Sequence, residues 1–190
     1  MSTTTTTKRW FNTEPLEELR RFSPPQLSDF PTRIFKNQKL PKARMLIDND
    51  YVWAVVEEMA KIPSPYKHSY VDVKVHKLSP GMGTTRLGHW HLDSSLNGDI
   101  EYDNFLFVSG EHALTEFVPV PLHLKRVKNS YEFDQQVKEN QFVPQRIKSC
   151  VITRYNGRNV HRGPVATGVE KRLLVRMIKT NRPSMPTRGI

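Results

Sequence analysis

The sequence predicts a mainly β fold, a barrel-like sandwich of antiparallel strands with two N-terminal helices packed outside one sheet. The first observation behind this prediction is that the clearest helical spacing of apolar residues lies in the first third of the chain. The second is that apolar residues recur at every second position from Ser69 onward. The third is that Gly, Pro, Asn and Ser separate the alternating segments, as turns between antiparallel strands do.

Two helices are expected ahead of the strands. Residues 13–22 carry a candidate N-cap at Thr13, acidic residues early and two arginines late, as the helix dipole favours. Residues 21–44 are broken by prolines and are expected to form a loop. Residues 48–63 predict the best helix, because four apolar residues follow i, i+3, i+4, i+7 spacing and Pro63 ends it. These four are Val52, Val55, Val56 and Met59.

Short strands follow to the end of the chain. SYVDVKVHKL, residues 69–78, alternates with its valines on one face. Residues 130–141 are expected to form a helix or a long excursion between strands. The other predicted strands lie within DIEYDNFLFVSG (99–110), LTEFVPVP (114–121), KSCVITRY (148–155), RNVHRG (158–163) and KRLLVRMIKT (171–180).

Length and composition suit one domain at residues 13–190, with a β core at about 69–180, behind a flexible arm at residues 1–12. The single cysteine, Cys150, excludes a disulfide framework and is expected to be a packed, buried side chain. A reducing, cytoplasmic setting fits this cysteine content. No apolar run approaches the roughly 20 residues that cross a bilayer, so no membrane span is expected.

The net charge of +10 is concentrated near the C-terminus. Residues 151–190 contain nine Lys or Arg against Glu170 alone, and so contribute +8. Such a concentration attracts phosphates, nucleic acid or small anionic acids, or it is a solvated surface. Aromatic residues do not alternate with the basic ones in this quarter, as they usually do in proteins that bind single strands.

Residues 88–95, GHWHLDSS, place His89, His91 and Asp93 on one face if the segment is a strand. One H-x-D pair is weak evidence, but His161 on a later predicted strand supplies a third ligand. Two imidazoles and one carboxylate on one face form the triad that holds non-haem Fe(II) and leaves positions open for substrates. His91, Asp93 and His161 are therefore the predicted metal ligands and catalytic residues.

Arg172 opens the last strand, eleven residues after His161. The apolar face of this strand, with Leu173, Val175 and Met177, is expected to pack on the helices. Its other side chains, including Arg172 and Arg176, would then point into the barrel. A buried guanidinium is costly unless it is paired, and the distal carboxylate of an anionic cosubstrate would pair it. Arg172 is the first candidate for this role and Arg176 the second.

At these residues the chain resembles the 2-oxoglutarate/Fe(II)-dependent oxygenases, whose core is a double-stranded β-helix, a jelly-roll or cupin-like barrel. The resemblance covers roughly residues 69–180, and its motif is H-x-D, a distal H, and an R about ten residues later. LSPGMGTTRLGHWHLD (78–93) also resembles the glycine-containing turn before H-x-D, and LFVSGEHALTEFVPVP (106–121) resembles the strand pair after it. The resemblance implies Fe(II) on the three predicted ligands, with 2-oxoglutarate chelating the iron while Arg172 holds its far carboxylate.

The resemblance further implies an oxidoreductase, a dioxygenase that uses O₂ to hydroxylate or demethylate an unidentified prime substrate. Succinate and CO₂ would be the coproducts. The positive charge makes an anionic substrate, nucleic acid or an acidic metabolite, admissible. Two residues depart from the family pattern, because Leu174 stands where many members have serine and Leu78 where a tyrosine is common. The second hydroxyl contact to 2-oxoglutarate is therefore unassigned.

Two other interpretations stay open. GTTRLGHWH (83–91) resembles the opening of a cupin metal site that would use His89, His91 and His161, although the expected glutamate does not follow. The chain could instead be a non-catalytic jelly-roll or cupin-like binding or assembly protein that contacts nucleic acid. The remaining histidines are expected to be ordinary packed residues: His68, His76, His112 and His123.

Overall fold

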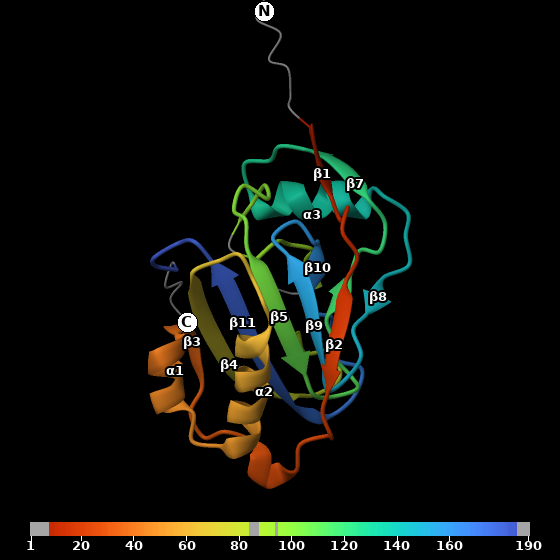
Figure 1. Ribbon diagram of the computed structural model, residues 1–190. Helices are drawn as coiled ribbons and strands as arrows, with labels where there is room; N and C mark the ends of the chain where they lie inside the picture. Colours follow the sequence, from red (N-terminus) through yellow and green to blue (C-terminus); the bar gives the residue numbers. More distant parts are fainter. Residues whose placement is uncertain (1–7, 84–87, 94, 186–190) are drawn as a thin grey trace, which may run out of the picture.

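A computed structural model describes residues 8–83, 88–93 and 95–185 of the chain (Figure 1). It contains eleven named strands, three α-helices and one short 3₁₀ helix within these ranges. In chain order they are β1 (Lys8–Phe11), β2 (Glu17–Arg21), η1 (Leu27–Asp29), β3 (Phe35–Lys39), α1 (Leu40–Leu46), α2 (Asp50–Lys61), β4 (His68–Leu78), β5 (Asp103–Val108), β6 (Glu116–Phe117), β7 (Leu122–Lys125), α3 (Ser130–Lys138), β8 (Gln145–Arg146), β9 (Val151–Asn156), β10 (His161–Arg162) and β11 (Glu170–Thr180).

The strands form three antiparallel sheets, which confirms a mainly β fold. The large sheet has the order β2-β9-β5-β11-β4-β3, and a smaller sheet has the order β10-β6-β8. A two-stranded ribbon pairs β1 with β7. Apolar side chains from β5, β9 and β11 meet Phe117 of β6 in one buried cluster, so the smaller sheet packs on one face of the large one.

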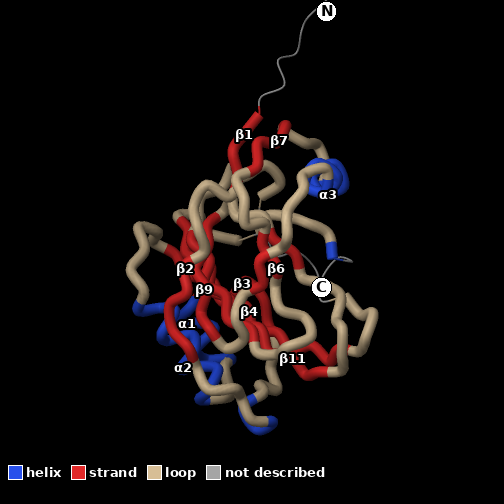
Figure 2. The backbone as a smooth tube through the Cα atoms, turned by 90° about the vertical axis from the view of Figure 1, so that its right-hand side faces the viewer, coloured by secondary structure: helices blue, strands red, loops and turns tan. Residues whose placement is uncertain are grey.

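Helices α1 and α2 pack on the opposite face of the large sheet, and α2 confirms the helix predicted at residues 48–63. Figure 2 shows α1 and α2 on one side of this sheet and β6 on the other. The buried valines of α2 contact the apolar face of β11, where Leu173, Val175 and Met177 are fully buried. Asn49 is the N-cap of α2, because its side chain accepts a hydrogen bond from the Val52 amide. The alternation in β11 therefore turns Arg172 and Arg176 away from the helices and toward the smaller sheet.

Two predictions for the first fifty residues are wrong. Residues 13–22 were predicted as a helix, but residues 17–21 form β2, which covers the edge of β9. Pairing with β9 gives β2 backbone hydrogen bonds, and ion pairs join Glu17 to Arg154 and Glu18 to Lys148. These tertiary contacts override the weak helical propensity of the segment. Residues 21–44 were predicted as a loop, but they contain β3 and the start of α1.

The prediction of a flexible arm at residues 1–12 is also wrong for its last five residues. Residues 8–11 form β1, and Phe11 and Asn12 are buried. Val160 donates its amide to the Asn12 side chain, which fastens this segment to the metal-ligand region described below. Residues 1–7 lie outside the described residues.

The predicted helix at residues 130–141 is confirmed, because α3 covers residues 130–138. Cys150 is buried, with 4% of its surface exposed, as expected for a packed side chain. In the described part of the chain, the helices are too short or too polar to span a lipid bilayer.

Candidate metal centre

His91 and His161 meet through a single backbone bridge between two otherwise separate segments. The His91 amide donates to the His161 carbonyl at 2.9 Å, and the reverse bond measures 3.1 Å. His161 begins β10 and is paired in turn with Phe117 of β6. The prediction that residues 88–95 form a strand is wrong beyond this one bridge. The bridge alone is enough to bring the two imidazoles together.

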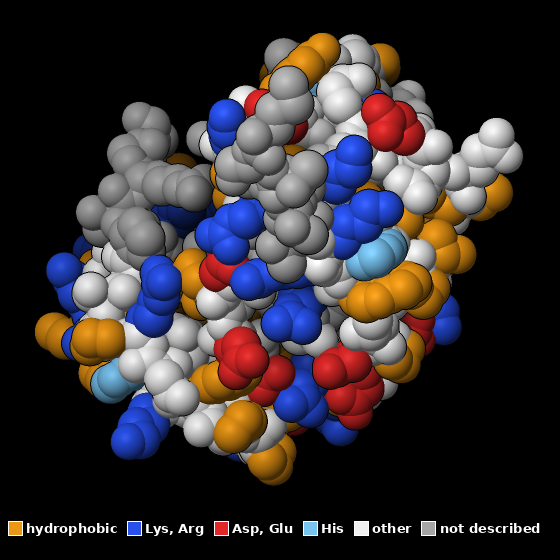
Figure 3. Space-filling view, turned by 90° about the horizontal axis from the view of Figure 1, so that it is seen from above, with side chains coloured by type: hydrophobic (Ala, Val, Ile, Leu, Met, Phe, Trp, Pro, Cys, Tyr) orange, Lys and Arg blue, Asp and Glu red, His pale blue; other side chains and the backbone are white. Residues whose placement is uncertain are grey.

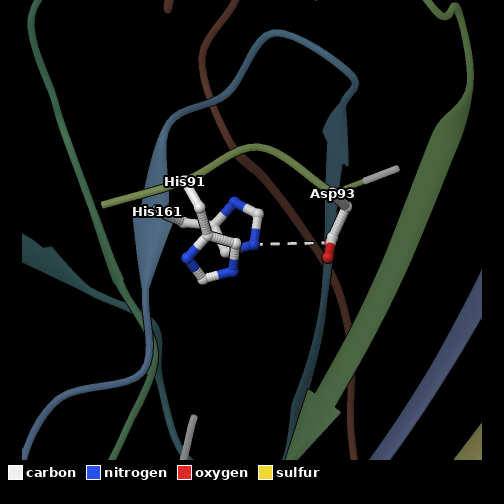
Figure 4. A group of neighbouring side chains, drawn as sticks. All are labelled: His91, Asp93 and His161. Atoms are coloured by element: carbon white, nitrogen blue, oxygen red, sulfur yellow. Dashed lines mark ion pairs between the residues drawn. The ribbon is translucent and has the colours of Figure 1, made fainter. Parts of the chain in front are cut away.

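The three predicted metal ligands come together in the structure (Figure 4). One ligand atom from each of His91, Asp93 and His161 lies within 4.8 Å of the others. Nε2 of His161 lies 3.3 Å from Oδ2 of Asp93, and the two imidazole centroids are 4.6 Å apart. His161 is 5% exposed and the Asp93 side chain is 13% exposed. This group could hold a metal ion, because nitrogen and carboxylate donors converge on one shielded point.

Backbone carbonyls set the orientation of both imidazoles. Nδ1 of His91 lies 2.9 Å from the His89 carbonyl, and Nδ1 of His161 lies 3.0 Å from the Asn159 carbonyl. A carbonyl only accepts, so each Nδ1 carries a proton, which leaves Nε2 as the ring atom available to a metal. Burial and the neighbouring His161 lower the pKa of His91 to about 4. His91 is therefore neutral and ready to ligate at pH 7.

Asp93 is held by three side chains that sequence reasoning did not connect with it. The Tyr155 hydroxyl donates to Oδ2 at 2.7 Å, and the Asn104 amide donates to the same oxygen at 3.2 Å. Arg176 forms an ion pair with Oδ1. Burial alone would raise the pKa of Asp93, but the charges of Arg176 and His161 hold it well below its usual range. The carboxylate therefore stays ionised, as a metal ligand must.

Arg176 bridges two carboxylates. Its second contact is Asp72 of β4, at 2.6 Å, and Asp72 is 1% exposed. These partners neutralise the guanidinium. Arg176, the second candidate for cosubstrate binding, is thus a partner of the metal ligand Asp93. The alternation of β11 could have placed Arg176 in the interior, but only the structure identifies its carboxylates.

Arg172 is buried without a carboxylate. Its surface is 1% exposed, and in the described residues no acidic side chain forms an ion pair with it. Its polar contacts are His76 Nδ1 at 3.3 Å and Thr115 Oγ1 at 3.4 Å, both long, and its Nε is buried with no hydrogen-bond partner in the described structure. Burial lowers the pKa of Arg172 to about 10, partly opposed by Glu170. A charged group with spare donors thus faces the interior.

The segment before and within β6 connects Arg172 to the metal ligands. Thr115 contacts Arg172, and Phe117, two residues later, packs its ring 5.2 Å from the ring of His161. Residues two apart on extended backbone share a face and lie roughly 7 Å from each other. The buried guanidinium and the metal ligand therefore contact neighbouring positions on one face of the same segment.

The other residues singled out in the sequence have structural partners of their own. His89 bonds through Nδ1 to Asp134 of α3 at 2.9 Å and is not one of the clustered ligands, which leaves the cupin ligand set without support. Trp90 is 3% exposed, and Leu78 is buried. His76, expected to be an ordinary packed histidine, is a neighbour of Arg172. Residues 84–87 of the glycine-containing turn lie outside the described residues.

The chemistry of this site follows from its geometry alone. The group offers two oriented imidazoles and an ionised carboxylate that could hold a metal ion. The buried Arg172, whose Nε is unpaired among the described residues, contacts Thr115, two residues before the Phe117 that packs on His161. Comparisons of the chain with protein-family models, curated proteins and solved structures find no match.

Proposed function

We propose that this chain is an Fe(II)- and 2-oxoglutarate-dependent oxygenase that hydroxylates or demethylates a substrate. The observation that carries the proposal is the combination of a His-Asp-His group with a buried arginine that lacks a carboxylate among the described residues. Either feature alone has an ordinary structural explanation. Together they match a site that needs one dianionic cosubstrate beside one divalent metal.

The donor set fits ferrous iron. Two imidazoles and one carboxylate on adjacent backbone segments are the facial ligand set of non-haem Fe(II) oxygenases. His91, Asp93 and His161 would hold the metal. When bound, iron would supply the oxidising chemistry by which one oxygen atom of O₂ enters a C–H bond of the prime substrate, while the other oxidises 2-oxoglutarate to succinate and CO₂.

The surroundings of Arg172 fit the far carboxylate of 2-oxoglutarate. Its partnerless Nε and long contacts leave donors for a bidentate carboxylate. Thr115 supplies a hydroxyl beside the guanidinium. This hydroxyl would take the place of the serine that many members of the family have at the position of Leu174. Thr115, which contacts Arg172, and Phe117, which packs on His161, lie two residues apart, so the guanidinium and the candidate metal ligand contact the same short segment.

The order of strands supports a double-stranded β-helix, the jelly-roll-like barrel of this family. From β4 onward, successive segments alternate mainly between the two sheets. β4, β5, β9 and β11 belong to the large sheet, β6, β8 and β10 form the smaller one, and His91 is joined to β10 by a single bridge. In this arrangement the ligand-bearing segments lie at neighbouring positions of the smaller sheet, and Arg172 projects toward them from the large sheet.

The chain's own residues would prepare the site for the metal. Tyr155 and Asn104 fix one oxygen of Asp93, while Arg176 fixes the other. Burial raises the pKa of Tyr155 well above its usual value, as does the nearby Asp93, so the hydroxyl stays protonated and donates. Partners of this kind orient a ligand before the metal arrives.

One observation favours the alternative, a non-catalytic binding or assembly protein. The ion pair between Arg176 and Asp93 competes with a metal for the same carboxylate. In that reading the His-Asp-His group would be a structural network that closes the barrel. Metal binding discriminates the two readings, because a structural network has no need of iron.

Anaerobic titration tests the proposal directly. We expect stoichiometric Fe(II) binding by calorimetry, a visible absorption band on adding 2-oxoglutarate, and succinate formation on admitting O₂. His91→Ala should remove all three signals. His89→Ala is the matched control, because the His89 side chain contacts α3 and not the ligand group, and alanine keeps the backbone carbonyl that orients His91. A wild-type protein that binds neither metal nor 2-oxoglutarate would refute the proposal.

A further inference from the structure

The ribbon of β1 and β7 has two chemically different faces. Phe11, Leu122 and Leu124 point inward and are buried. The opposite face, here called the outer face of the ribbon, consists of exposed aromatic and basic side chains. These are Lys8, Trp10, His123 and Lys125.

Trp10 and His123 form an aromatic stack on this outer face. They are cross-strand partners, with ring centroids 4.6 Å apart and planes only 10° from parallel. Trp10 is nevertheless 54% exposed. Because His123 covers one face of the indole, the ring is held in place while much of its surface stays open to solvent. A rigid, exposed aromatic surface of this kind is a platform on which an unpaired base can stack.

Lys8 and Lys125 stand directly opposite each other on the same outer face. Like charges at cross-strand partner positions destabilise a pair of strands. In the described part of the chain, neither lysine forms an ion pair that would offset this repulsion. A phosphate shared between the two ammonium groups would remove it. On this ribbon, two lysines flank a stacked tryptophan. Basic and aromatic residues therefore alternate here, as they do not in residues 151–190.

Further basic side chains extend the positive surface beyond the ribbon. Figure 3 shows lysine and arginine side chains gathered at this end of the molecule, with several carboxylates among and beside them. Arg126 and Lys128 follow β7 and are exposed. A cavity of about 590 Å³ is lined by Arg158, Arg182 and Arg9, whose side chain alternates to the face of Phe11 and not to the outer face. Asp99 pairs with Arg9 and Arg126, so the surface is not uniformly cationic.

The ribbon covers the segments that carry the metal ligands. Its inward side chains pack in one buried cluster with Trp90 and Leu92, the neighbours of His91, and with Val160, the neighbour of His161. A polymer bound to the outer face would therefore lie above the backbone that positions the candidate metal centre.

We propose that the outer face of the ribbon binds single-stranded nucleic acid, with a base stacked on Trp10 and phosphates at Lys8 and Lys125. A duplex fits less well, because its bases are already stacked on each other. A lipid surface fits less well, because Trp10 is the one large apolar side chain on this outer face. Binding itself does not require the oxygenase activity. That the bound strand is the prime substrate rests on the proposed function.

The test uses fluorescein-labelled twelve-residue oligothymidylate and oligouridylate, with the full chain in EDTA so that iron plays no part. We expect fluorescence anisotropy to report binding that weakens with salt. Trp10→Ala should raise Kd about tenfold or more, whereas Trp10→Phe should keep most of the affinity, because a phenyl ring still stacks. Circular dichroism would verify that the variants fold.

The lysines make a separate prediction. Replacing Lys8 and Lys125 by glutamine should lower the slope of log Kd against log salt by about 0.7 for each phosphate that the variant no longer neutralises. The matched control removes two exposed lysines elsewhere, Lys42 and Lys67, and should leave this slope nearly unchanged.

Three results would overturn the proposal. Trp10→Ala binding as tightly as the wild type would mean that any binding is purely electrostatic. A twelve-base-pair duplex binding as well as the single strand would exclude base stacking. Binding to vesicles containing phosphatidylserine, with none to either oligonucleotide, would make the ribbon a membrane contact. All of these measurements are made without metal. A negative result would therefore not bear on the oxygenase proposal, and failure of the oxygenase proposal would not bear on nucleic-acid binding.

Discussion

Replacing Arg172 by methionine should stabilise the metal-free protein. Burial lowers the pKa of this guanidinium to about 10, and each pKa unit corresponds to about 1.4 kcal/mol, so keeping the charge in the interior costs roughly 3 kcal/mol. The two long hydrogen bonds to His76 and Thr115 return about 0.5–1 kcal/mol each. Methionine should therefore raise the free energy of unfolding by about 1–2 kcal/mol. For a chain of 190 residues this is a rise in Tm of about 3–6 °C.

The same substitution should remove the response to 2-oxoglutarate. Deleting one partner of a buried ion pair costs about 3–5 kcal/mol, which is at least about a hundredfold in Kd. Differential scanning calorimetry of the metal-loaded protein measures both effects. At a 2-oxoglutarate concentration of 100 Kd, the wild type should gain about 2.7 kcal/mol. Arg172→Met should unfold at the same temperature with and without 2-oxoglutarate.

Arg176→Met is the matched control, because it makes the same change on the same face of the same strand. This arginine has two buried carboxylate partners, Asp72 and Asp93. Its removal leaves both unpaired and should cost about 3–5 kcal/mol, lowering Tm by about 10 °C. If Arg172→Met lowered Tm in the same way, or kept the 2-oxoglutarate response, Arg172 would be a structural residue and the reasoning would fail.

Three further predictions follow from contacts elsewhere. Tyr155→Phe should weaken metal affinity about 10–100-fold in competition with a chromophoric chelator; unchanged affinity would mean that the hydroxyl does not orient Asp93. The metal-free protein should lose stability as pH falls from about 6.5 to 4, because His76 and His91 have pKa values lowered to about 4 and the unfolded chain then binds more protons. A constant urea midpoint across this window would contradict that. Asn49→Ala should lower the free energy of unfolding by about 1 kcal/mol in urea, through loss of the α2 N-cap.

Periodicity in the sequence located most of the strands and both faces of β11. Alternation works there because one face must pack on α2, and so the other face must point to the interior. The candidate metal ligands were identified for a related reason. Histidine and aspartate side chains that cluster away from solvent, as His91, Asp93 and His161 do, seldom serve packing alone. One backbone bridge between His91 and His161 brings the two segments into contact, without the regular strand that the alternation predicted.

The errors arose where a distant segment decides local structure. Residues 17–21 have helical propensity, but the free edge of β9 requires a partner strand. Residues 8–11 look like the end of a disordered tail, yet pairing with β7 and burial of Phe11 include them in the fold. Both partner strands lie far along the chain, in its second half, so no local pattern could have indicated them.

The interior face of β11 shows why the type of a residue does not settle its role. Arg172 and Arg176 have the same side chain, the same strand face and nearly complete burial. Arg176 is neutralised by Asp72 and Asp93 before any ligand arrives, whereas Arg172 has only a neutral histidine and a hydroxyl within reach. Burying an uncompensated charge opposes folding, and a chain retains such a charge most readily where a ligand later compensates it. The unequal pairing of two identical residues, more than either motif, is the observation on which the proposal of a dianionic cosubstrate rests.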